Sequence, residues 1–105
     1  MLIKAKPLNP ELFAPFGQVL MGSGEIPERI PFAAKVENYR SNANLNITYL
    51  HVNSVELPLK IEALERHFYS NQIFVPLNGT RHLIVVCPKT KDDEPNLLKL
   101  EAFTA

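Results

Sequence analysis

The chain has 105 residues, of which 46% are hydrophobic and 21% charged, and its 11 basic and 11 acidic side chains balance to a formal net charge of zero. These proportions are typical of one globular domain and exclude a disordered chain. Nucleic acid is not an expected partner, because the Lys and Arg residues are scattered and form no basic patch.

The sequence also limits membrane insertion and cysteine chemistry. The longest uninterrupted apolar run, Leu83 to Cys87, is far shorter than the roughly 20 residues that a membrane-spanning helix requires. No apolar signal segment follows Met1. We therefore expect a cytoplasmic protein with no membrane partner. Cys87 is the only cysteine, which excludes an internal disulfide, and its apolar neighbours predict an inert, buried thiol.

The first expected element is a short helix at about residues 10–16. The side chain of Asn9 suits an N-cap, and Pro10 stands at the first helical position, where its missing N–H costs no hydrogen bond. Pro15 limits the helix to about two turns. Residues 22–41 contain turn-forming residues without a hydrophobic period, so we expect irregular structure there.

β-Strands are expected between residues 44 and 105. Residues 44–52 (NLNITYLHV) are rich in β-favouring residues and begin with alternating apolar side chains. The next segment places four apolar residues on one face at a period of two: Leu57, Leu59, Ile61 and Ala63. A helix over residues 61–67 competes with this interpretation, although Pro58 and the shortness of the run weaken it.

A β-hairpin is predicted around Asn78 and Gly79. This pair stands between two β-rich runs, 72–77 and 80–86, and a type I′ turn requires the positive φ that Asn and Gly tolerate. Residues 97–104 alternate again as a strand. The whole pattern predicts a mainly β fold of five or six short antiparallel strands, a sandwich or a barrel, in a single domain.

The stretch ERHFYSNQIFVPLNG resembles, in its spacing, the first metal motif of the cupin superfamily. That motif has two histidines flanking one residue, followed at set distances by a glutamate and a glycine. The corresponding residues here are Glu65, His67, Gln72 and Gly79. A period of two directs Glu65 and His67 to one face of a strand, and the hairpin returns Gln72 beside them. We therefore expect three polar groups to converge inside a barrel.

Two kinds of chemistry fit these residues. Glu65, His67 and Gln72 could in principle hold a divalent cation, but an amide is a weak ligand and no fourth ligand is evident, so we expect no metal or other cofactor. For acid/base catalysis, His67 is the candidate for proton transfer, because histidine is the side chain best suited to that role at physiological pH. Glu65 orients it or accepts a proton, and Gln72 binds the substrate. Arg66 has the opposite parity and is a candidate for binding a substrate carboxylate. A structural interpretation stays open, in which Glu65 and Arg66 form a surface ion pair.

Three runs of the chain resemble the ureidoglycolate lyase family, also called ureidoglycolate hydrolase, which has a cupin fold. These runs are PLNPELFAPFGQVL, LPLKIEALERHFYSNQIFVPLNG and EPNLLKLEAFTA, and the part from LERH to Gln72 is the most specific. Three residues depart from the family pattern: Phe68, Asn96 and Glu101 replace a proline, an aspartate and an arginine. The family continues into a Trp-His segment, so we expect the match to cover its N-terminal two thirds.

The resemblance implies a cupin-like double-stranded β-helix, or jelly-roll barrel, that is incomplete in this chain or is completed by dimerisation. It also implies a homodimeric lyase that releases urea and glyoxylate from ureidoglycolate in allantoin and purine degradation. In this assignment His67 and Glu65 are catalytic, and Arg66 and Gln72 bind the substrate. Two alternatives remain: a non-catalytic cupin-like protein that binds a small carboxylate or ureide, and an interaction module that pairs through open strand edges.

Overall fold

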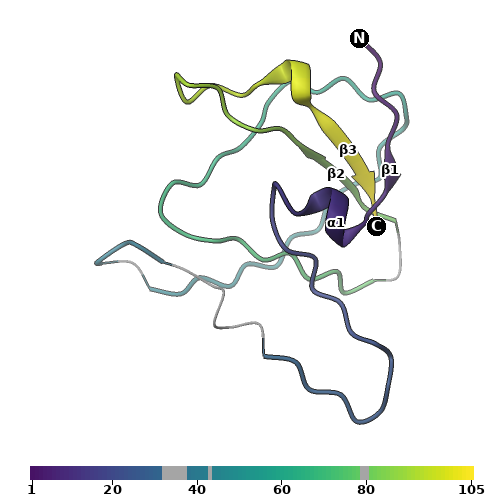
Figure 1. Ribbon diagram of the computed structural model, residues 1–105, viewed down its shortest axis with the longest axis vertical. Helices are drawn as coiled ribbons and strands as arrows, with labels where there is room; N and C mark the ends of the chain where they lie inside the picture. The colour runs from purple at the N-terminus through teal and green to yellow at the C-terminus, as the bar shows by residue number, and fades with distance from the viewer. Residues whose placement is uncertain (32–37, 43, 79–80) are drawn as a thin grey trace. The chain divides into compact units, whose positions relative to one another are not determined.

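A computed structural model describes residues 1–31, 38–42, 44–78 and 81–105 (Figure 1). The chain separates into two compact units, which are described one at a time. The sheet unit consists of residues 1–32 and 74–105, and the crossing unit consists of residues 33–73. The regular elements of the described residues belong to the sheet unit: β1 (Lys6–Pro7), α1 (Pro10–Phe13), β2 (Leu83–Val86), the 3₁₀ helix η2 (Leu97–Lys99) and β3 (Glu101–Thr104).

The sheet has three strands in the order β1-β3-β2. β1 runs parallel to β3, with Lys6 opposite Phe103, and β2 runs antiparallel to β3, with Ile84 opposite Phe103. Beyond the strand ends, His82 and Ala105 exchange two backbone hydrogen bonds of 2.9 and 3.0 Å. All four residues of β2 (LIVV) are apolar and three of them are β-branched, which suits a pleated and half-buried strand.

The core of the sheet unit is an aromatic cluster around Phe103. This side chain is fully buried, and Ala102 is the other buried hydrophobic residue among those that the structure describes. The ring of Phe13 meets Phe103 edge-on at 5.3 Å between centroids, and the ring of Phe16 lies 6.5 Å away. Edge-to-face packing of this kind stabilises aromatic pairs beyond the area they bury. The cluster thus attaches α1 and the turn after it to the sheet.

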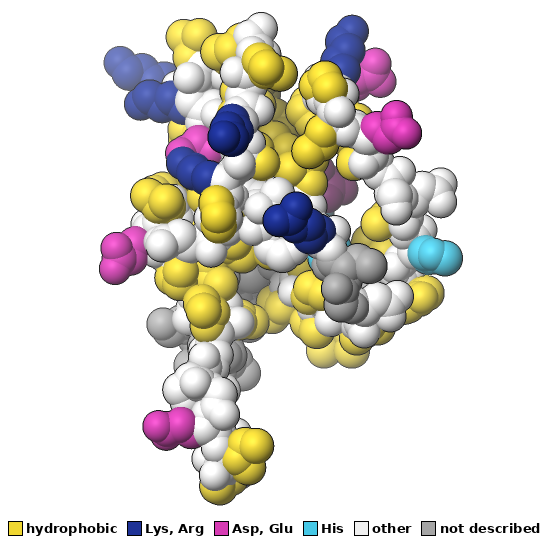
Figure 2. All heavy atoms as spheres, turned by 90° about the vertical axis from the view of Figure 1, so that its right-hand side faces the viewer, with side chains coloured by type: hydrophobic (Ala, Val, Ile, Leu, Met, Phe, Trp, Pro, Cys, Tyr) yellow, Lys and Arg dark blue, Asp and Glu magenta, His cyan; other side chains and the backbone are white. Residues whose placement is uncertain are grey.

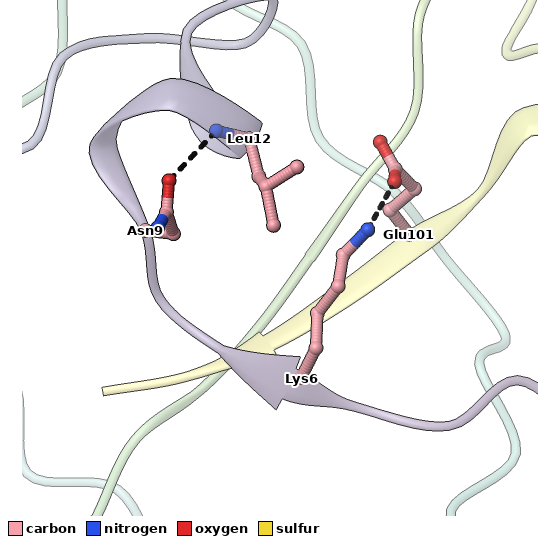
Figure 3. A network of polar contacts seen from close by, with 4 residues as sticks. All are labelled: Lys6, Asn9, Leu12 and Glu101. Atoms are coloured by element: carbon pink, nitrogen blue, oxygen red, sulfur yellow. Dashed lines mark hydrogen bonds and ion pairs between the residues drawn. The ribbon is translucent and has the colours of Figure 1, made fainter.

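Helix α1 begins as the sequence predicts and ends earlier. The Asn9 side chain accepts hydrogen bonds from the backbone N–H groups of Glu11 (2.9 Å) and Leu12 (3.1 Å), and Pro10 occupies the first turn. Figure 3 shows the bond to Leu12. The expected helix over residues 10–16 is one turn long, and residues 14–16 form a turn instead. Pro15 explains the difference, because it has no N–H to continue the ladder.

Lys6 and Glu101 form an ion pair across the β1 and β3 strands. Lys6 Nζ lies 2.6 Å from Glu101 Oε1 (Figure 3). The same ammonium group lies 5.1 Å from the centroid of the Phe103 ring. Glu101 was one of the departures from the family pattern, where an arginine is usual. In this chain the reversed charge has an opposite charge beside it, so the substitution is locally compensated.

The strands predicted between residues 44 and 78 are not present in the structure. The described residues of this range contain one isolated antiparallel bridge, between Ser70 and Asn38, and no ladder. An alternating segment becomes a strand only beside a hydrogen-bonded neighbour, and here the alternating apolar side chains of residues 44–52 are exposed, with Leu45 at 84% and Ile47 at 88%. Figure 2 likewise shows hydrophobic side chains at the surface among scattered charged ones.

The predicted hairpin is incomplete as well. β2 lies within its second run, but residues 72–77 form no strand, and Gly79 lies outside the described residues. The structure is therefore a small open sheet with little helix, and the jelly-roll barrel and the single domain stay predictions. In the described part of residues 22–41 there is no helix or strand except the bridge at Asn38, as expected. Across the ranges that the structure describes, no helix is long and apolar enough to cross a membrane.

Candidate functional site

All four predicted site residues lie in the crossing unit, and two of them are in contact. His67 Nε2 lies 3.2 Å from Glu65 Oε2. The two residues are separated by one position, and their side chains meet on the same side of the chain. The His67 side chain is 35% exposed and the Glu65 side chain 76% exposed, so solvent and small molecules reach both.

The pair has the arrangement of an oriented general base. A carboxylate beside Nε2 favours the imidazole tautomer that carries its proton on that nitrogen. Nδ1 of His67 then has an unshared electron pair with which to accept a proton from a bound hydroxyl group. When His67 is protonated, the same contact becomes an ion pair that stabilises the imidazolium.

Arg66 points to a different neighbour. Its guanidinium carbon lies 4.1 Å from the centroid of the Phe68 ring, a cation–π contact. The Phe68 ring in turn lies 6.2 Å from the ring of Tyr69. Arg66, Phe68 and Tyr69 thus form a row of side chains next to the Glu65–His67 pair in sequence. Phe68 stands where the family usually has proline, and the aromatic ring gives Arg66 a surface on which to lie.

Gln72 does not join the other predicted site residues. It is exposed, and within the described ranges it makes no hydrogen bond to Glu65 or His67. The predicted convergence of three polar groups requires a hairpin that the structure does not form. Glu65 and His67 supply two ligands of the kinds that bind divalent cations. Among the residues described, no three His, Cys, Asp or Glu side chains are grouped so that they could hold a metal ion. The expectation that the site binds no metal stays a prediction.

Sequence analysis missed a surface hollow of about 400 Å³ in the same unit. It is lined by five residues from two segments: Tyr39, Arg40, Ser41, Asn42 and Tyr69. The segments meet at the Asn38–Ser70 bridge, next to which the Tyr39 N–H donates a 2.6 Å hydrogen bond to the Tyr69 carbonyl. The signal available in the sequence was the presence of Tyr39, Arg40 and Tyr69 in two segments that lack a hydrophobic period.

One carboxylate in the sheet unit has a clear electrostatic perturbation. Glu28 accepts hydrogen bonds from the Ser23 hydroxyl (2.6 Å), the Ser23 N–H (2.8 Å) and the Gly24 N–H (3.1 Å). These donors, led by the Ser23 hydroxyl, lower the pKa of Glu28 because they favour its ionised form. Glu28 thus ties together the two ends of an exposed loop, and it is not part of the predicted catalytic pair.

Comparison with known proteins gives a consistent result. The family model described as ureidoglycolate lyase matches residues 1–105. A ureidoglycolate lyase of Mesorhizobium japonicum is 39% identical over 98 residues, covering 86% of this chain and 60% of the relative. Ureidoglycolate lyases of Pseudomonas aeruginosa and Brucella anthropi are each 34% identical, covering 92% and 95% of this chain and 62% of their own length. The chain therefore spans about three fifths of these relatives. No solved structure matches it significantly.

Proposed function

The chain belongs to the ureidoglycolate lyase family, and from this premise we propose that it takes part in the cleavage of ureidoglycolate to glyoxylate and urea. The observation that supports this reaction is the contact of 3.2 Å between His67 and Glu65. A histidine oriented by a carboxylate is suited to proton transfer near neutral pH.

The reaction needs proton transfers and no oxidant or reductant. Ureidoglycolate carries a hydroxyl group and a ureido nitrogen on the same carbon. His67 removes the hydroxyl proton, and the electrons of the O–H bond form the C=O bond of glyoxylate. The C–N bond breaks, its electrons remain on nitrogen, and that nitrogen takes up a proton as urea leaves. Because one proton is removed and one is returned, His67 serves as base and then as acid, with Glu65 stabilising its charged form.

The remaining predicted residues keep their roles as part of the proposal. Arg66 and Gln72 are assigned to substrate binding. No metal or other cofactor is assigned, because proton transfer alone balances the reaction. The breakdown of allantoin and purines in the cytoplasm is the corresponding metabolic setting.

A cupin-like barrel, completed by further strands such as those of a second copy in a homodimer, is proposed as the full fold. The exposure of Leu45, Ile47 and Tyr49 supports it, since these alternating apolar side chains suit one face of a sheet that packs against another layer.

A direct assay tests the proposed reaction. Release of urea and glyoxylate from ureidoglycolate is measured with the purified chain and with His67→Ala. We expect His67→Ala to lower kcat by about 10²–10⁴-fold, the usual contribution of a general acid/base. His51→Ala is the matched control, because His51 is an exposed histidine of the same unit, and it should keep full activity. Absence of turnover by the unaltered chain, or equal activity of both variants, contradicts the proposal.

A further inference from the structure

The hollow beside the Asn38–Ser70 bridge is lined by a positively charged side chain, Arg40, that has no role in the predicted site. Arg40 is exposed and lies in its wall together with Tyr39 and Tyr69. The Arg40 backbone is held by its N–H, which donates a 3.1 Å hydrogen bond to Asn38 Oδ1. Within the described residues, its guanidinium group has no ion pair or hydrogen bond. The hollow therefore presents a positive charge to solvent on a backbone that is held in place.

The chemistry of the lining suits a small carboxylate. A guanidinium group offers two parallel N–H donors that match the two oxygens of a carboxylate. Ser41 and Asn42 add a hydroxyl group and an amide beside it. The hollow has a volume of about 400 Å³ and is open to solvent, so a small anion can reach its lining. The described residues that line the hollow include no acidic side chain that would compete with an incoming anion for Arg40.

Arg66 is less suited to this role than its position in sequence suggested. Its guanidinium lies against the Phe68 ring, and Phe68 in turn contacts Tyr69, which lines the hollow. Arg66 is thus linked through Phe68 to a residue that lines the hollow. Tyr69 follows His67 by two residues, and the antiparallel register that pairs Asn38 with Ser70 brings the residues after Asn38 toward those before Ser70. The hollow and the Glu65–His67 pair therefore belong to the same unit, and a residue that lines the hollow follows His67 by two positions.

We propose that Arg40 binds the carboxylate of the small-molecule substrate, between Tyr39 and Tyr69. The identity of that substrate rests on the proposed lyase function, whereas the carboxylate site itself rests on the hollow alone. Arg40 holds the carboxylate end, and the hemiaminal carbon of the substrate extends toward His67. Arg66 is then a positioning residue that acts through Phe68 and Tyr69.

The test is a binding titration with sodium glyoxylate, and with urea as an uncharged comparison. Binding is followed by NMR through the backbone amides and the arginine Nε–H signals of the full chain. We expect glyoxylate to shift the Arg40 Nε–H signal saturably. Arg40→Gln should raise the Kd for glyoxylate by about ten- to hundredfold, the usual effect of losing hydrogen bonds to a charged group. Arg40→Lys should lie between the two, because it keeps the charge and loses the paired donors.

Matched variants separate this site from the rest of the surface. Arg29→Gln removes an exposed arginine of the sheet unit and should leave the Kd unchanged. Arg66→Gln should raise the Kd less than Arg40→Gln does. The proposal is overturned if glyoxylate does not bind the unaltered chain, if the Arg40 signal does not move, or if Arg66→Gln has the larger effect.

Turnover measured on the same samples distinguishes the two proposals. Glyoxylate binding through Arg40 without ureidoglycolate cleavage supports the carboxylate site and contradicts the lyase function. Cleavage with an unchanged Kd and KM in Arg40→Gln supports the lyase function and overturns the role of Arg40.

Discussion

The sheet unit and the crossing unit use the same kinds of residues in opposite ways. In the sheet unit, three strands are hydrogen-bonded and Phe103 is fully buried among aromatic rings. In the crossing unit, the described residues share one isolated bridge and none is buried, yet this unit contains the His67–Glu65 pair and the Arg40 hollow. Stability is thus concentrated in one part of the chain and accessible chemistry in the other. Sites that bind small molecules are often drawn from the less stable part of a fold.

The largest expected effect breaks the aromatic cluster. Phe103→Ala should lower the free energy of unfolding by about 3–5 kcal/mol, because it removes a buried ring and leaves a cavity. The matched variant in the crossing unit is Phe68→Ala, whose side chain is 65% exposed and which should cost about 1 kcal/mol or less. Urea denaturation of both variants measures the difference. Equal losses of unfolding free energy would show that stability is not concentrated in the sheet unit.

A helix cap provides the second and smaller effect. Asn9→Ala removes the acceptor for two N–H groups of α1 and should cost about 1 kcal/mol. Asn38→Ala removes a single acceptor in an exposed segment, and we expect a loss within about 0.5 kcal/mol. Thermal denaturation of the two variants compares an asparagine that begins a helix with one that closes a turn. A larger loss for Asn38→Ala would place the stability in the crossing unit.

The smallest effect is a pH dependence in the Glu28 loop. The lowered pKa of Glu28 means that its hydrogen bonds stabilise the folded loop above the unfolded pKa, and that this stabilisation is lost as the pH falls through the folded value. The Ser23 and Gly24 amide signals should therefore titrate below the ordinary value of 4.5. Glu28→Gln should abolish this titration, and Glu25→Gln should leave it intact. Titration at or above 4.5 would show that these hydrogen bonds are absent in solution.

Local signals in the sequence predicted the local features of the structure. The cap at Asn9 depends on residues two and three positions away, and β2 and β3 lie within runs of β-favouring residues. The contact between Glu65 and His67 joins residues two positions apart, as a period of two predicts. Each of these features needs no information about distant parts of the chain.

Features that depend on distant partners could not be predicted in the same way. β1 is two residues long and has no hydrophobic period, so its pairing with β3 leaves no trace in its own sequence. The Arg40 hollow exists because Asn38 and Ser70 meet, and neither residue signals the other. Conversely, residues 44–52 have the residue types and alternation of a strand, but the structure contains no strand there. A strand also requires a hydrogen-bonded neighbour, which this pattern cannot supply by itself.

The ion pair between Lys6 and Glu101 joins residues 95 positions apart, and this separation has a consequence for synthesis on the ribosome. At about 5–20 residues per second, roughly 5 to 20 s pass between the addition of Lys6 and that of Glu101. During this interval β1 has no strand to pair with, and the rings of Phe13 and Phe16 lack the residue that they later cover. The nascent chain therefore carries uncovered aromatic rings in its amino-terminal segment until β3 has been synthesised.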